Sequence, residues 1–262
     1  MFLDIVQPQF FYRVLCSAIL IFIVAKTVIR AGPLFGGIIA GVPMGLAPGF
    51  YFLIEPNNSE FLFSTALNSL IALNATQIFL LNYMFLAKLF TPIVCVIISV
   101  LVWFILALGL LKLNSDLISA TFLYLFITYF ARRIGRIVVL AVDNRSPVVR
   151  PRLLYLRAIL GGLLIGAVTI LSSQLGSELS GTLLAFPIGF ALIAFIAHTD
   201  FDESIVIKVL FSTILGTISL ATFCISFAIL TTYLSSDLAF ILGLLVAILA
   251  TIFILFLQKL NI

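Results

Sequence analysis

The sequence predicts an all-α polytopic membrane protein, a single bundle of about nine transmembrane helices. Of the 262 residues, 63% are apolar and only 9% are charged, whereas a soluble domain is about 45–50% apolar and about 25% charged. The apolar residues also fall in long runs, and no polar stretch is long enough to form a separate aqueous domain. So few charges cannot cover a water-facing surface, and most of the exterior is expected to face the lipid bilayer.

Each predicted span is a run of about 20 apolar residues, the length at which a helix crosses the hydrocarbon core of a bilayer. Spanning strands are excluded because the runs do not alternate and isolated strands would leave backbone groups unpaired in lipid. The N-terminal residues lack the basic region and cleavage site of a signal peptide, so the first span is expected to be retained. The spans lie near residues 9–29, 33–54, 61–83, 86–110, 115–131, 154–174, 178–198, 206–233 and 238–258.

The distribution of basic residues predicts the orientation. The longest polar break, 132–153, carries together with Arg157 seven arginines and one acidic residue, Asp143. Short basic loops stay on the cytoplasmic side of a membrane, which places this loop inside, the N-terminus outside and the C-terminus inside. The same count of spans leaves only Arg13 and Lys112 of the fourteen Lys and Arg residues outside. The agreement supports both the number of spans and their direction.

The second and seventh spans share a pattern of glycine and proline. One reads GPLFGGIIAGVPMGLA from Gly32 and the other reads GSELSGTLLAFPIGFA from Gly176, an offset of 176 − 32 = 144. The same offset, continued without a gap, pairs Gly37 with Gly181, Pro43 with Pro187, Gly45 with Gly189 and Asn68 with Ser212. The pattern predicts an internal duplication.

The predicted duplication divides the chain into three parts: a first four-helix repeat over 1–114, a connecting helix with the basic loop over 115–153, and a second four-helix repeat over 154–262. Because one extra span separates the halves, they enter the membrane from opposite sides. This is an inverted-topology repeat, an arrangement found in many secondary transporters.

The glycine and proline helices are the candidate site. In inverted-repeat transporters the substrate lies near the midplane, between helices that are interrupted. A proline lacks the backbone N–H, so Pro43 and Pro187 are expected to free the carbonyls near Ile39 and Leu183. The candidate substrate-binding residues are Gly37, Gly41, Pro43, Gly45, Asn68, Gly181, Pro187, Gly189 and Ser212. The alternative role of the small-residue stripes is close helix packing, and the two roles are compatible.

Polar residues inside the third and eighth spans also have two possible roles. They either form hydrogen bonds between helices or line a polar pathway, because unpaired polar groups are costly in lipid. His198, with acidic residues close behind it, either titrates near neutral pH or is an ordinary interfacial residue. The polar set comprises Asn68, Ser69, Asn74, Thr76, Gln77, Ser212, Thr213 and Thr217.

Other classes of function find no support in the residues. No HExxH or GxSxG motif and no intramembrane pair of acids is present, so no enzyme and no catalytic residue is expected. Cys16, Cys95 and Cys224 lie singly in apolar runs, so neither a metal nor a cofactor is expected. Nucleic-acid binding is not expected either. The loop from Arg132 to Arg157 either signals topology or binds an anionic lipid or an acidic partner, and a homo-oligomer is left open.

The sequence FPIGFALIAFIAH at 186–198, with the spacing of four spans around it, resembles the small four-helix inner-membrane proteins of the GlpM type. The segment AGPLFGGIIAGVPMGLAPGFYFL is similar to uncharacterised multi-span membrane proteins of alphaproteobacteria. The resemblance covers essentially 10–112 and 154–258, and it implies a four-helix unit located in a bacterial inner membrane. It implies no activity. Pro48 departs from the repeat, since Leu192 stands at the equivalent position.

Together these expectations favour a small permease for an unidentified solute, with its site between the two interrupted helices. The alternative is a membrane component that does not transport, such as a regulatory or assembly subunit of an envelope complex.

Overall fold

The computed structural model describes residues 32–43, 46–54, 57–113, 115–141 and 175–260, together with six isolated residues between 15 and 30. Within these ranges every regular element is a helix, which confirms the all-α prediction. The predicted spans 9–29 and 154–174 lie outside the described ranges, as does Gly45. The helices are α2 (Pro33–Ala40), α3 (Ala47–Ile54), α4 (Ser59–Leu86), α5 (Pro92–Leu110), α6 (Leu117–Leu140), α8 (Ser177–Leu184), α9 (Ile188–Asp200), α10 (Glu203–Leu230) and α11 (Ser236–Leu260).

Among the described residues, five helical segments are long and apolar enough to cross a membrane: α4, α5, the α8–α9 segment Ser177–Asp200, α10 and α11. Large apolar side chains point outward, such as Ile105 of α5 with 72% of its surface exposed and Phe122 of α6 with 68%. Asn74 and Gln77 of α4, in contrast, are fully buried. An apolar exterior around buried polar groups is what lipid as the solvent demands, and these features are those of a membrane-embedded protein.

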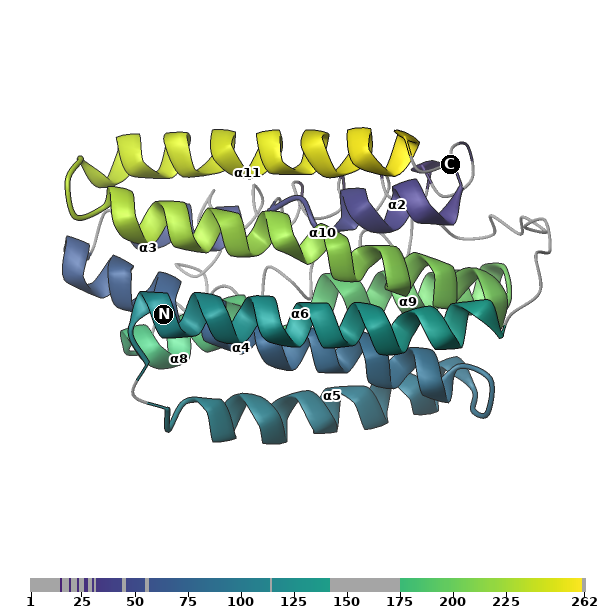
Figure 1. Cartoon of the computed structure of the whole chain (residues 1–262). Coiled ribbons are helices and arrows are strands. Elements are labelled where there is room, and N and C mark those ends of the chain that lie inside the picture. Colours follow the sequence, from purple (N-terminus) through teal and green to yellow (C-terminus); the bar gives the residue numbers. More distant parts are fainter. Residues whose placement is uncertain are drawn as a thin grey trace.

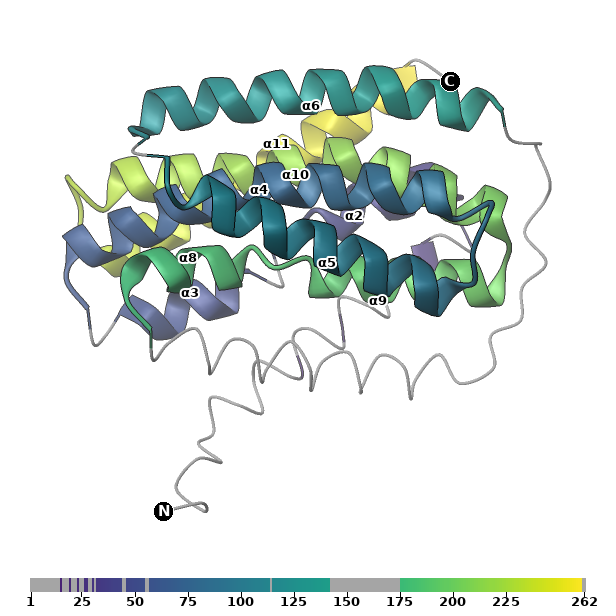
Figure 2. The same cartoon turned by 90° about the horizontal axis from the view of Figure 1, so that it is seen from below.

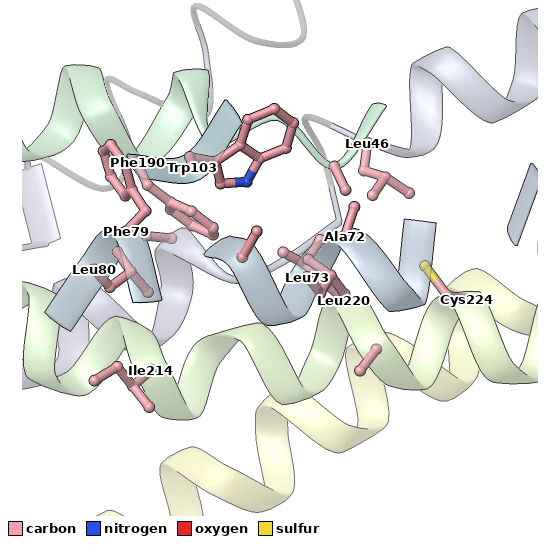
Figure 3. Packing of buried hydrophobic residues seen from close by; sticks show 14 of the residues in the cluster. Leu46, Ala72, Leu73, Phe79, Leu80, Trp103, Phe190, Ile214, Leu220 and Cys224 are labelled. Carbon is pink, nitrogen blue, oxygen red and sulfur yellow. The ribbon is translucent and has the colours of Figure 1, made fainter. Parts of the chain in front are cut away.

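The two helices α4 and α10 form the centre of the bundle (Figures 1 and 2). They contact each other, and each of them also contacts α6. Figure 2 shows α6 on one side of this pair and α8 and α9 on the other. The buried apolar side chains gather along the same axis, among them Phe79 of α4, Ile214 of α10 and Trp103 of α5 (Figure 3).

Helix α6 extends beyond the predicted end of its span at 131 and continues to Leu140. Two of its arginines, Arg132 and Arg133, contact other residues. The Arg132 Nη1 donates to the Phe211 carbonyl of α10 at 2.8 Å, and the guanidinium lies 3.7 Å from the centre of the Phe211 ring. The Arg133 guanidinium lies over the Tyr129 ring. The contact of Arg132 with α10 stabilises the helix beyond the end of the apolar run.

Both predicted glycine and proline spans are interrupted helices. The first interruption separates α2 from α3, and the second separates α8 from α9. A tight turn closes each helix before the break: the Val42 N–H donates to the Ile39 carbonyl at 3.0 Å, and the Phe186 N–H donates to the Leu183 carbonyl at 3.1 Å. The expectation that the Ile39 and Leu183 carbonyls are free is therefore wrong, because bonds between residues three apart take them up.

The helix boundaries recur at the offset found in the sequence. Helices α2 and α8 cover 33–40 and 177–184, and helices α4 and α10 cover 59–86 and 203–230, each pair displaced by 144 at both ends. The N-caps match as well: Asn58 accepts from the Phe61 N–H and Asp202 from the Ile205 N–H. In Figure 1, α4 and α10 run in opposite directions, and so do α5 and α11.

Candidate functional site

Helix α2 crosses α10 through a backbone contact that only glycine permits. A Cβ atom on Gly37 would overlap the Val209 carbonyl oxygen and the Ser212 hydroxyl, and one on Gly41 would overlap the backbone of Gly216. On Gly216 an added Cβ would lie 2.7 Å from the Ile38 carbonyl oxygen. With no side chains between them, the two backbones touch, which is how small residues bring membrane helices together.

Helix α8 crosses α4 in the equivalent way. A Cβ atom on Gly181 would overlap the Thr65 carbonyl oxygen, and it would lie 2.9 Å from the Asn68 Cβ and 3.0 Å from the Ser69 nitrogen. Thr65, Asn68 and Ser69 are displaced by 144 from Val209, Ser212 and Thr213, the three residues that Gly37 meets. Each interrupted helix therefore lies on the long helix of the other half, at equivalent residues.

Most of the predicted site residues belong to these two crossings. Gly37 lies against Ser212, and Gly181 lies against Asn68. The nearest neighbours of each glycine stripe are on a long helix, and the stripes do not lie on each other. Pro43 and Pro187 are buried in the breaks, and Gly189 is half-buried in the first turn of α9. In this arrangement the glycines serve close packing.

Two hydroxyl groups of α4 tie the second break to the bundle. The Ser69 Oγ donates to the Gly181 carbonyl at 2.8 Å, and the Thr76 Oγ1 donates to the Ala185 carbonyl at 3.0 Å. The equivalent residues of α10 make no such bonds, because the Thr213 hydroxyl donates to the Val209 carbonyl of its own helix and Leu220 has no hydroxyl. The two crossings thus share a backbone arrangement and differ in these side-chain hydrogen bonds.

A second polar group lies at the junction of α4, α6 and α10. The Gln77 Nε2 lies 2.7 Å from the Thr217 Oγ1, 2.9 Å from the Thr128 Oγ1 and 3.2 Å from the Tyr124 hydroxyl. The Tyr124 and Thr217 hydroxyls are 2.8 Å apart. Asn74 lies one turn before Gln77 on α4, and all five side chains are buried. We call these five residues, Asn74, Gln77, Tyr124, Thr128 and Thr217, the amide cluster.

Sequence reasoning found only part of this cluster. Asn74, Gln77 and Thr217 stand out as polar residues within apolar runs, whereas Tyr124 and Thr128 lie on the predicted connecting helix and received no role. Their spacing of four residues places both on one face of α6. That face also carries buried Ala120 and Ala131, and a small and polar stripe of this kind is the signal that could have identified it.

The remaining candidate, His198, lies on α9 with its Nδ1 atom 3.3 Å from the Tyr83 hydroxyl of α4. The imidazole is half-buried. In the part of the chain that the structure describes, no group of three or more His, Cys, Asp or Glu residues could hold a metal ion. The contact with Tyr83 makes His198 part of the α4–α9 packing.

No family model, no curated protein and no solved structure matches the chain.

We predict that a single methyl group at the α2–α10 crossing destabilises the fold. Gly41→Ala forces a Cβ into the Gly216 backbone, so the unfolding free energy should fall by about 1–3 kcal/mol, the usual cost of overpacking. Gly109→Ala is the matched control, since a Cβ there meets nothing within 4 Å. Thermal unfolding of the purified chain measures both. An equal response of the two variants would contradict the crossing.

Proposed function

We propose that the chain is a small membrane permease built from two inverted four-helix repeats around its two interrupted helices. The observation that carries this proposal is the reciprocal crossing of α2 on α10 and α8 on α4. Reciprocal contacts at a constant offset are expected when two copies of one unit are related by a twofold axis. The paired helices run in opposite directions (Figure 1), which supports an axis lying in the membrane plane, the symmetry of inverted-repeat transporters.

The full proposal has nine spans, with 9–29 and 154–174 as the first helix of each repeat and α6 as the connection. It retains the predicted orientation in a bacterial inner membrane, with the N-terminus outside and the C-terminus in the cytoplasm. The interrupted helices α2–α3 and α8–α9 then have breaks at similar depth on opposite sides of the twofold axis. Backbone that departs from a helix at membrane depth is tolerated where protein or a watery cavity covers it.

Alternating access follows from the difference between the halves. In a chain with two equivalent halves, one conformation holds one half tightly and the other loosely, and exchanging the two conformations exposes the opposite face of the membrane. The α8–α9 break is held by the Ser69 and Thr76 hydroxyls, whereas Thr213 and Leu220, the equivalent residues of α10, make no such bond to α2. In this proposal the described conformation is one of two that the repeat makes available.

The chemistry of the bundle favours a solute without net charge. Buried polar groups of α4 and α10 are hydroxyls and amides, including Ser69, Asn74, Thr76 and Gln77. No Asp or Glu lies in the middle of α4, α5, α10 or α11, and ionic coupling commonly uses such a residue. A uniporter of a small neutral solute fits these groups best.

One observation favours the alternative, a membrane component that does not transport. The glycine stripes meet backbone so closely that no solute can reach the Gly37, Gly41 and Gly181 faces in this conformation. A regulatory or assembly subunit needs only such static packing. The two functions differ in whether the breaks ever open to water.

The inverted relation of the repeats predicts the sides of two matched positions. Ser59 and Glu203 are the exposed first residues of α4 and α10, displaced by 144. In a background without native cysteines, S59C and E203C should react with a membrane-impermeant thiol reagent from opposite faces of sealed vesicles. K88C, just beyond the end of α4, should react from the same face as E203C. Labelling of S59C and E203C from one face would remove the inverted repeat.

The permease predicts that the break at Pro187 opens to water on both sides. Gly189 is half-buried two residues after this proline. We expect G189C to react with a small impermeant methanethiosulfonate reagent added to either side of the vesicles. I105C, on the outward face of α5, should stay unreactive because lipid covers it. If G189C reacts from one side or neither, the chain does not alternate and the non-transport function is favoured.

A further inference from the structure

The amide cluster contains buried polar atoms that lack partners. Asn74 and Gln77 are both fully buried, and the Asn74 Oδ1 and Gln77 Oε1 are the only buried side-chain N or O atoms without a hydrogen-bond partner among the residues that the structure describes. Buried polar groups in native proteins nearly always have a partner, so an exception points to a missing water or ligand. The two unpartnered groups lie one turn apart on α4, and this proximity points to one bound molecule that contacts both.

The orientation of Asn74 is fixed by its neighbours. Its Nδ2 lies 2.9 Å from the Ile71 carbonyl oxygen and 3.5 Å from that of Leu70. Carbonyl oxygens only accept hydrogen bonds, so the NH2 end must face them and the Oδ1 must be the open atom. The open position at Asn74 is therefore an acceptor for which the described residues supply no donor.

Gln77 differs because its neighbours are hydroxyls. Three hydroxyl oxygens surround the Nε2, whereas an amide NH2 has two hydrogens to donate. Hydroxyls can donate as well as accept, so either end of the amide can face them. In both orientations one end of the Gln77 amide lacks a hydrogen-bond partner. The three hydroxyls can form further hydrogen bonds.

These groups converge near the middle of the bundle. Asn74 and Gln77 are three residues apart and thus neighbours on one face of α4. Tyr124 and Thr128 come from α6, and Thr217 comes from α10. Asn74 and Thr217 are the sixteenth and fifteenth residues of helices that are each 28 residues long. A binding group at this depth, between three helices, lies near the midplane, where secondary transporters bind their solutes.

The charge of the cluster restricts what can bind. None of its five residues is ionisable near neutral pH, and the nearest cation along α6, Arg132, is engaged by the Phe211 carbonyl and ring. An ion without a countercharge is expensive at membrane depth. The open Asn74 Oδ1 requires an N–H or O–H donor, and the open end of Gln77 requires a donor or an acceptor, according to which way its amide faces.

We infer that the amide cluster is a binding site for a small neutral solute that donates a hydrogen bond to Asn74 and forms a second one with Gln77, of the amide or polyol class. This inference deepens the proposed permease by placing the solute at Asn74 and Gln77, between α4, α6 and α10, and away from the glycine crossings. Binding at the cluster does not itself require transport.

The single tryptophan of the chain reports on this site. The Trp103 Nε1 donates to the Thr76 Oγ1 at 3.1 Å, and Thr76 directly precedes Gln77. We expect the Trp103 emission of the purified full chain to change saturably when acetamide or glycerol is titrated in. The two probes distinguish an amide from a polyol. If neither acetamide nor glycerol changes the emission saturably, the inference is overturned. A saturable response to sodium chloride alone would overturn it as well.

Variants identify where the probe binds. N74L should raise the half-saturating concentration by about tenfold or more, and Y124F, which removes one hydroxyl, by about fivefold. N82L is the matched control, because the Asn82 Nδ2 already donates to the Ser99 Oγ at 3.0 Å, and it should stay within about twofold of the parent. Gel filtration checks that each variant folds. If N74L does not fold, Y124F alone tests the site. An unchanged half-saturating concentration in folded N74L or Y124F would overturn the site.

Uptake of the same probe into proteoliposomes separates this inference from the proposed function. Binding without uptake would overturn the permease and leave the site intact. Uptake that N74L and Y124F do not slow would leave the permease and overturn the site.

Discussion

The fold depends on two places where backbone touches backbone. At both places an interrupted helix lies across a long one, α2 on α10 and α8 on α4, and a glycine removes the side chain that would hold them apart. In lipid, helices gain little from burying apolar surface against each other, so close packing and hydrogen bonds between helices must supply the association. The glycine crossings supply the packing, and because each joins one half of the chain to the other, they bind the halves into one bundle.

The breaks in these helices cost less than a proline in a spanning helix would suggest. Tight turns take up the carbonyls at Ile39 and Leu183, and the Ser69 and Thr76 hydroxyls take up those at Gly181 and Ala185. The unsatisfied polarity of the described bundle lies at the amide cluster instead, where Asn74 has an open oxygen and one end of the Gln77 amide lacks a partner. Natural proteins retain such groups at sites where something else binds. The bundle thus separates two roles that the sequence places together: the glycines hold the helices, and the amides are free to bind.

The offset of 144 could be predicted from the spacing of Gly37, Pro43 and their counterparts, because glycine and proline have backbone requirements that survive when other residues diverge. The helical breaks and the polar character of α4 were predictable for the same reason. The partner of each stripe was not. Nothing in a glycine pattern tells whether Gly37 faces Gly181 or Ser212, since that depends on how the halves are arranged in space. Tyr124 and Thr128 were missed because a hydroxyl on a connecting helix is unremarkable until a neighbouring amide is seen beside it. The length of α6 was also missed, because the contact of Arg132 with Phe211 is a tertiary one.

Disulfide trapping tests whether each interrupted helix packs on the long helix of the other half. The Ser64 and Ser177 hydroxyl oxygens are 2.9 Å apart, so oxidation should cross-link S64C/S177C, a pair that joins the two halves. The pairs within one half, P33C/S64C and S177C/S212C, should not cross-link. Cross-linking within the halves in place of cross-linking between them would contradict the reciprocal packing on which the two-repeat architecture rests.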